Sequence, residues 1–200
     1  MSSSRLTGNA RIVQDCCIDL YNNVQKWRRN SSEASFIFCQ LCELKHKELE
    51  RRAVETEEEA SDSMVIDAIM CEIQILIPKL NTELRKMMIV YEKMLKIENK
   101  LKAIHELSEM QHSGGTHVDL NPFKNWTVSG FFEATEEIIA MHAQELKTKL
   151  SISEELPISS DRSHVLFLES SWKYETEIDR HRVDFLLFNM RCQLDLQLEL

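Results

Sequence analysis

Glycine and proline are scarce in this chain of 200 residues, which holds four glycines and three prolines. An all-β fold needs a turn about every 8 to 12 residues, and turns depend heavily on these two residue types. The supply is too small for such a fold, and it permits long uninterrupted helices instead. The length suits one domain or one elongated helical assembly. Hydrophobic residues make up 43% of the chain, which excludes a wholly disordered protein.

Clustered positive charge and long apolar runs are also missing. The formal net charge is -9, which disfavours direct binding of nucleic acid because a phosphate-binding face needs clustered Lys and Arg. The longest apolar stretch, residues 73–80, is too short to span a membrane. The sequence shows no basic segment followed by an apolar core, so we expect no secretory signal. We therefore expect an intracellular reducing compartment in which the six cysteines stay free.

Residues that carry catalysis or hold cofactors form no recognisable pattern. Cys39, Cys42 and His46 have the spacing of half a zinc site, but the chain has no second Cys-x-x-Cys pair to complete it. Packing on a helix face is the favoured interpretation of these residues, over metal or redox chemistry. Neither a glycine-rich phosphate loop nor a G-x-S-x-G motif is present. We expect a protein that is not an enzyme and that holds no cofactor or metal.

Hydrophobic periodicity predicts an all-α fold with long antiparallel coiled-coil helices. The first helix is predicted over about 9–29 and the second over about 33–54, with Asn30–Ser32 as a break that caps the second helix. In the first helix the apolar residues alternate four and three apart, which is the spacing of a coiled-coil seam. These seam residues are Val13, Cys17, Leu20, Val24 and Trp27.

The third predicted helix covers about 64–111 and follows an acidic linker at 55–63. Its apolar residues keep a heptad-like rhythm from Ile66 to Leu107. Pro78 interrupts the rhythm without shifting its phase, so we expect it to kink the helix and not to end it.

The rest of the chain predicts a small C-terminal helical bundle over 122–200. Thr127 or Ser129 can cap one helix, which Pro157 stops, and Asp161 can cap the next. The predicted organisation is therefore a flexible N-terminus at 1–8, a coiled-coil region at 9–112 and the bundle.

Aromatic residues gather near the start of the predicted bundle, at Phe123, Trp126, Phe131 and Phe132. Two interpretations are open: they plug the core, or they are an exposed anchor for a protein partner, since such residues dominate binding hot spots. Trp27 lies on the seam of the first helix and is expected in the core.

These aromatic residues resemble the motif of the cyclin-dependent kinase 2-interacting protein family. The matching positions are Phe123, Trp126, Phe131, Phe132, Glu133, Met141, Glu145, Leu146 and Lys149. Near the N-terminus the match continues through Arg11, Ile12, Asp15, Asp19, Asn22, Lys26 and Trp27. Trp172 stands where the family has a Trp in its penultimate helix, while Thr127 and His142 replace a Pro and a Tyr of the family pattern.

The resemblance implies a non-catalytic adaptor or subunit of a nuclear multiprotein complex. It implies roles in DNA replication, the cell cycle and the DNA damage checkpoint, and in an AAA ATPase complex of ribosome biogenesis. The implied partners are cyclin-dependent kinases, checkpoint proteins or AAA ATPase subunits. The candidate protein-binding residues are Trp27, Phe123, Trp126, Phe131, Phe132, Glu133 and Trp172.

A homodimeric structural coiled coil is the alternative function. The same heptads favour it, because the apolar seam can be buried either within one chain or between two chains.

Overall fold

A computed structural model describes residues 8–53, 59–113 and 123–194 of the chain. Its elements are α1 (Asn9–Ala53), α2 (Glu59–Ser113), α3 (Val128–Glu155), the 3-10 helix η1 (Leu156–Ile158), α4 (Arg162–Tyr174) and α5 (Arg180–Leu194). No strand occurs among these residues, so the predicted all-α fold is confirmed.

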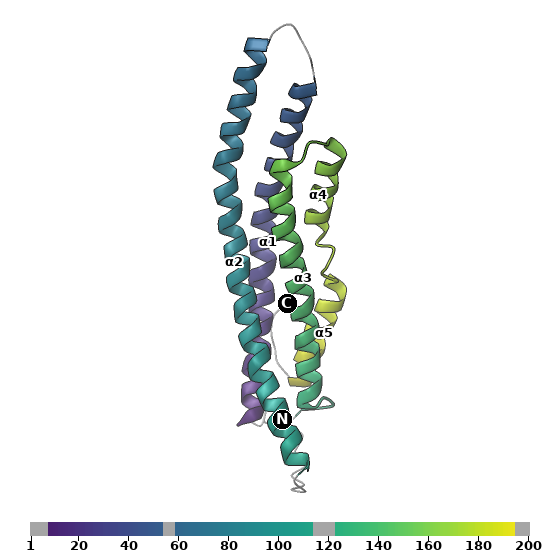
Figure 1. Cartoon of the computed structure of the whole chain (residues 1–200). Coiled ribbons are helices and arrows are strands. Elements are labelled where there is room, and N and C mark those ends of the chain that lie inside the picture. The colour runs from purple at the N-terminus through teal and green to yellow at the C-terminus, as the bar shows by residue number, and fades with distance from the viewer. Residues whose placement is uncertain (1–7, 54–58, 114–122, 195–200) are drawn as a thin grey trace. The chain divides into compact units, whose positions relative to one another are not determined.

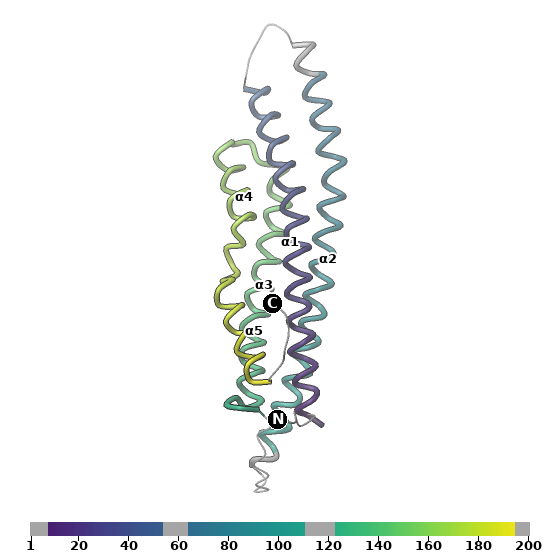
Figure 2. Tube along the Cα trace, turned by 180° about the vertical axis from the view of Figure 1, so that it is seen from behind, coloured from purple at the N-terminus to yellow at the C-terminus, as the bar shows by residue number. Residues whose placement is uncertain are grey.

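The two longest helices, α1 and α2, pack together. Figure 1 and the reverse view in Figure 2 both show α2 running alongside α1 in the opposite direction. This is the long antiparallel helix pair that the heptad spacing predicts. None of the described helices is long and apolar enough to cross a membrane.

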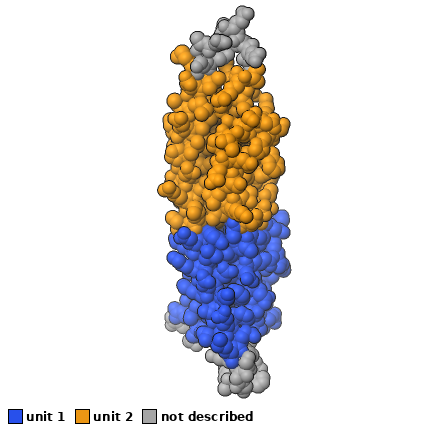
Figure 3. Space-filling view, in the orientation of Figure 1, with its two compact units in different colours: residues 1–26, 90–143, 178–200 blue, residues 27–89, 144–177 orange. Residues whose placement is uncertain are grey.

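Contacts divide the chain into two compact units (Figure 3). Unit 1 comprises residues 1–26, 90–143 and 178–200, and unit 2 comprises residues 27–89 and 144–177. In the described residues, unit 1 draws helical segments from α1, α2, α3 and α5, and unit 2 draws them from α1, α2, α3 and α4 with η1. Each unit thus contains residues of both predicted regions, 9–112 and 122–200.

The predicted seam of α1 is buried at every position. In unit 1 its residues pack into a core with apolar residues of three other helices. The fully or nearly fully buried members of this core are Val13, Leu20, Val24, Met94, Leu101, Phe131, Ile138, Val183 and Met190. Burial of such side chains is the main force that holds a helical unit together.

The core of unit 2 is built around two tryptophans, Trp27 from α1 and Trp172 from α4. The other large buried side chains of this unit are Phe38, Leu41, Leu80, Leu84, Met87 and Leu168. The central part of the α2 rhythm is thus buried, while Leu107 at its end is 51% exposed.

The structure differs from the predicted break at Asn30–Ser32, because α1 is one continuous helix across these residues. The hydroxyl of the buried Ser31 donates to the carboxylate of Glu175, which lies after α4. A serine that has a partner elsewhere in the unit does not need to cap a new helix, so tertiary contact overrides the local preference.

The acidic linker predicted at 55–63 is shorter than expected, because α2 already begins at Glu59. Other boundaries follow the predicted signals. Pro78 lies inside α2 and does not end it, and the hydroxyl of Thr82 donates to the Pro78 carbonyl oxygen over 2.8 Å. Asp161 caps α4 as predicted, its side chain accepting from the backbone N–H groups of Ser163 and His164. The predictions for residues 1–7, 54–58, 114–122 and 195–200 lie outside the described residues.

Candidate functional site

The aromatic motif lies in unit 1, around the start of α3. Phe123 and Phe131 are buried, and their ring centroids are 4.7 Å apart. Trp126 is half-buried and meets the Phe131 ring edge to face at 5.2 Å. These spacings are typical of favourable aromatic pairs. Phe123 and Phe131 therefore belong to the core, and Trp126 lies at its edge.

The segment that carries Trp126 is fixed by the C-terminal helix of the same unit. The side-chain oxygen of Gln193 on α5 accepts from the backbone N–H groups of Asn125 and Trp126, over 2.7 and 3.2 Å. Gly130 packs under the indole, and a Cβ added there would lie 3.4 Å from the Trp126 ring. A Cβ at Gly130 would therefore be in van der Waals contact with the indole.

Phe132 and Glu133 lie on the outer side of the motif. Phe132 is half-buried and stacks on His105 of α2, with ring centroids 5.5 Å apart. Glu133 is exposed and accepts a hydrogen bond of 2.6 Å from the Ser129 hydroxyl. Of the motif residues, Trp126, Phe132 and Glu133 thus reach the surface of unit 1. Their role in protein binding stays a prediction.

A second group of motif residues forms a buried cluster in unit 2, centred on Trp172. The Trp172 ring stacks on Phe38 at 4.1 Å, nearly parallel at 8°. Its Nε1–H donates to the Ser35 hydroxyl over 3.2 Å. The Lys149 ammonium lies 4.6 Å from the centre of the same ring, a distance at which a cation is attracted to the ring face.

Lys149 is fully buried and has several oxygen partners. Its Nζ donates to the Trp172 carbonyl oxygen over 3.0 Å. It also lies 3.2 Å from a Glu145 carboxylate oxygen and 3.9 Å from one of Glu175. Lys149 therefore joins α3 to the end of α4.

The two carboxylates of this cluster have further partners that hold the chain as it leaves α4. Glu145 accepts from the backbone N–H of Glu177 over 3.2 Å. Glu175 ends α4 in a left-handed conformation, with φ 46°, which is uncommon for a residue other than glycine. The hydrogen bond from Ser31 and the nearby ammonium of Lys149 stabilise Glu175 there.

Burial raises the pKa of Glu145, and the nearby Glu175 adds to this effect. The ammonium of Lys149 and the N–H of Glu177 act in the opposite direction. Burying a carboxylate costs free energy unless it is paired and hydrogen-bonded. The cluster meets this condition through contacts within unit 2, and these contacts join α1, α3 and the end of α4.

The two positions that depart from the family pattern have different surroundings. His142 is buried, and its Nδ1 lies 2.7 Å from the Ile138 carbonyl oxygen on the same helix. Thr127 is exposed just before α3. The replacement at His142 therefore lies in the interior of unit 1, and the replacement at Thr127 lies on its surface.

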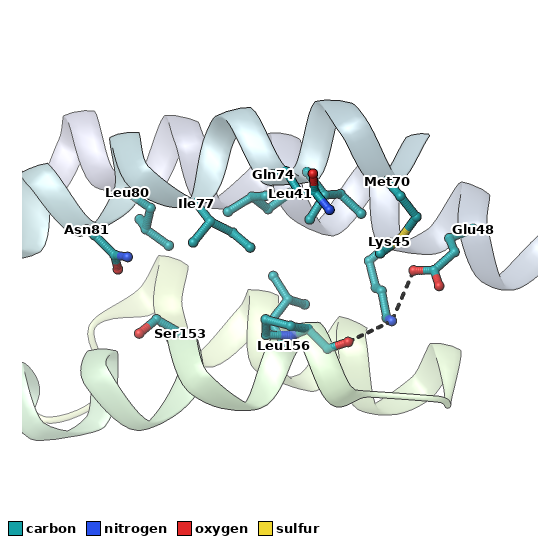
Figure 4. Close-up of a pocket in the computed structure, with 12 residues that line it drawn as sticks. Leu41, Lys45, Glu48, Met70, Gln74, Ile77, Leu80, Asn81, Ser153 and Leu156 are labelled. Carbon is teal, nitrogen blue, oxygen red and sulfur yellow. Dashed lines mark hydrogen bonds and ion pairs between the residues drawn. The ribbon is translucent and has the colours of Figure 1, made fainter. Parts of the chain in front are cut away.

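A pocket in unit 2 is lined by residues of α1, α2, α3 and η1. A cavity of about 120 Å³ here is lined mainly by apolar residues, among them Ile77, Leu80 and Leu156 (Figure 4). The Lys45 ammonium lies 3.0 Å from a Glu48 carboxylate oxygen and donates to the Pro157 carbonyl oxygen over 3.0 Å. Figure 4 shows this lysine reaching toward Glu48. This lysine links α1 to η1, as Lys149 links α3 to α4.

No group of three or more His, Cys, Asp or Glu side chains within 8–53, 64–110 and 123–194 is placed to hold a metal. Cys42 is buried and Cys39 is half-buried, both on α1. Burial raises the pKa of both thiols, and Glu169 adds to the effect. Raised thiol pKa values disfavour the thiolate form that metal binding and nucleophilic attack require.

Exposed aromatic residues on α4 and α5 escape prediction from the sequence. Phe167 and Tyr174 on α4 are 65% and 72% exposed. On α5, Phe185 and Phe188 are 54% and 52% exposed. Residues 185–188 are all apolar, and such a continuous run does not by itself reveal which of its residues face the solvent. The sequence signal that could group Phe185 with Phe188 is the helical period, because residues three apart lie on the same face of a helix.

The fold and these sites define an all-α protein of long antiparallel helices, whose buried charges fasten the helices together. No family model matches the chain. It is 25% identical over 178 residues to the cyclin-dependent kinase 2-interacting protein of Xenopus laevis, covering 88% of this chain and 84% of that protein. It is 24% identical over 179 residues to the Homo sapiens protein of the same name, covering 87% and 84%. The chain is a distant homologue of these proteins, which confirms the resemblance seen in its motif.

Proposed function

We propose that the chain is a non-catalytic binding partner of a cyclin-dependent kinase and an adaptor in a nuclear multiprotein complex. The observation that carries this proposal is the homology, over 88% of the chain, to a protein whose name states that it interacts with cyclin-dependent kinase 2. The buried ionic cluster at Lys149 is consistent with a non-catalytic role, because its charged groups contact one another and the backbone and so stabilise the packing of the helices.

The proposal extends to DNA replication, cell-cycle control and the DNA damage checkpoint. It also extends to a place as subunit of an AAA ATPase complex in ribosome biogenesis. The support for these roles, and for a nuclear location, is the family resemblance of the motif that begins at Phe123.

The surface that we assign to the partner is the exposed aromatic pair of α5. Phe185 and Phe188 are three residues apart and therefore share one face of the helix. The residues between them, Leu186 and Leu187, are buried and hold α5 in unit 1. Large exposed aromatics on a fixed helix suit a binding hot spot, because they bury much area at little cost in conformational entropy.

Affinity purification from nuclear extract, followed by mass spectrometry, tests the proposal. The baits are the tagged wild type, the double variant Phe185→Ala/Phe188→Ala and the control Phe36→Ala. Phe36 is 66% exposed on α1 in unit 2 and so matches the loss of an exposed ring elsewhere.

We expect a cyclin-dependent kinase or its complex to co-elute with the wild type and the control, and to be lost with the double variant. Circular dichroism checks that all three baits are equally helical. A wild-type bait that returns no such kinase contradicts the proposed function. Equal recovery with the double variant contradicts only the assignment of the surface.

A further inference from the structure

The face of α2 that turns away from the core of unit 2 carries a second seam of mostly apolar residues, with Thr82 and Arg85 as its polar members. Its residues alternate four and three apart, which is the spacing of a coiled coil. They are Met64, Ala68, Cys71, Ile75, Pro78, Thr82, Arg85 and Ile89, and all eight are exposed. We call this set the outer seam.

The outer seam is separate from the buried face of the same helix. Ile75 is 59% exposed, whereas Ile73, two residues earlier, is buried. Two residues correspond to about 200° of rotation around an α-helix, so these side chains lie on opposite faces. Beyond Ile89 the same spacing falls on the exposed polar residues Glu92 and Lys96. Among the residues whose burial the structure describes, the seam thus covers 64–89.

We propose that the outer seam binds a second copy of this chain, with the two α2 helices antiparallel. In an antiparallel coiled coil, each a position faces a d position of the other helix. One register matches the whole seam to itself. In that register the facing pairs, with one residue from each copy, are Met64 and Ile89, Ala68 and Arg85, Cys71 and Thr82, and Ile75 and Pro78.

Charges beside the seam favour this antiparallel register. Glu72 and Lys79 are exposed residues that flank the outer seam on the same side. In the antiparallel register Glu72 of one copy lies beside Lys79 of the other, and the two-fold symmetry repeats the pair. Arg85 meets the small Ala68, which leaves room for its guanidinium to reach water.

A parallel dimer of the same seam brings like charges together. Asp67 would lie beside Glu72 of the second copy, and Arg85 would face Arg85. Flanking charges set partner and orientation in coiled coils, and like charges at these positions are unfavourable. The seam and its flanks therefore specify a second copy in the antiparallel direction. This proposal is independent of kinase binding.

Light scattering of the purified full-length chain is the first test. We expect a mass of twice 23.4 kDa, falling to the monomer mass on dilution. Ile75→Glu should shift the protein to monomer without loss of helicity by circular dichroism. Leu107→Glu is the matched control, because Leu107 is 51% exposed on the same helix but lies outside the outer seam. Its mass should stay that of the wild type.

Disulfide trapping is the second test and reports the direction of the helices. In a Cys192→Ser background, Thr82→Cys places a thiol opposite Cys71 of the second copy. Facing residues of this kind come within disulfide reach. We expect a covalent dimer on oxidation, with Cys71 linked to position 82 by peptide mass spectrometry. The background variant, which has Cys71 without the new thiol, should give none through Cys71.

A wild-type chain that is monomeric at every concentration overturns the proposal. So does an outer seam that binds a different protein and never a second copy of this chain. A covalent dimer linked Cys71 to Cys71 shows a parallel pair and overturns the antiparallel register.

Discussion

Lys149 is the residue on which the structure of unit 2 depends most visibly. It is fully buried, and within 3.9 Å it meets two carboxylates and a carbonyl oxygen. Removing one partner of a buried ion pair leaves an uncompensated charge in a low-dielectric interior. Its burial cannot be predicted from the residue type, because a Lys on a helix is ordinarily solvated.

Lys149→Met is expected to lower the free energy of unfolding by about 3–5 kcal/mol, because Glu145 and Glu175 then lose their buried cation. Lys147→Met is the control, since Lys147 is exposed on the same helix; its change should stay within about 0.5 kcal/mol. Urea unfolding followed by circular dichroism measures both values. Equal effects of the two substitutions would contradict the buried ion pair.

Glu145 gives a prediction for pH. The pKa of Glu145 is raised in the folded state above its ordinary value of 4.5. The folded protein therefore keeps the carboxyl of Glu145 protonated at pH values where the unfolded chain has lost that proton. The stabilisation from this group is therefore complete below the ordinary pKa and is lost as the pH rises through the raised one. We expect the stability of the wild type relative to Glu145→Gln to fall over this window. A difference that grows with pH, measured by urea unfolding, would contradict the shift.

Among the elements, α1 shows where local sequence signals mislead. The polar run at 30–32 is a good capping signal, and it predicts that one helix ends and another begins there. The partner that removes the break, Glu175, lies 144 residues further along the chain. Such a distant contact has no sequence signature. By contrast, Asp161 acts locally, and its cap on α4 could be predicted.

Ser31→Ala should destabilise the protein by about 1–3 kcal/mol, because it removes the hydrogen bond that the Ser31 hydroxyl donates to the buried carboxylate of Glu175. Ser32→Ala removes the same hydroxyl from the exposed neighbouring position and should have little effect. Thermal unfolding of both variants provides the comparison. If Ser32→Ala were the more damaging change, a capping role for this run would be favoured instead.

For the candidate site, the sequence identifies the residues of the family motif, but it does not predict which of them are exposed. The family motif pointed to Phe123, Trp126 and Trp172, and the structure buries the first and last of these and half-buries the second. Exposure depends on which neighbours cover a side chain, and those neighbours come from helices far apart in the sequence. The exposure of Phe185 and Phe188 escapes prediction from the sequence for the same reason.

At the level of the whole molecule, residues of the predicted regions 9–112 and 122–200 pack together within each unit. In unit 2, Phe38 stacks on Trp172 and Arg162 pairs with Glu50. In unit 1, His105 stacks on Phe132. Helical periodicity predicted the helices and their buried faces, but periodicity alone does not say which helices share a core.

Expressed separately, residues 1–121 and 122–200 should each fail to unfold cooperatively, because each lacks half of the core of both units. Mixed together, they should regain helicity and a cooperative thermal transition. Circular dichroism of the two pieces and of their mixture is the measurement. A cooperative, stable 122–200 fragment would instead support the independent C-terminal bundle that the sequence predicts.

The central claim is that this chain binds a cyclin-dependent kinase, and isothermal titration calorimetry with purified cyclin-dependent kinase 2 tests it most directly. We predict saturable binding by the wild type, with affinity at least about tenfold weaker for Phe185→Ala/Phe188→Ala, as expected for a hot-spot residue worth more than about 1.4 kcal/mol. Absence of any binding by the folded wild-type chain would contradict the claim.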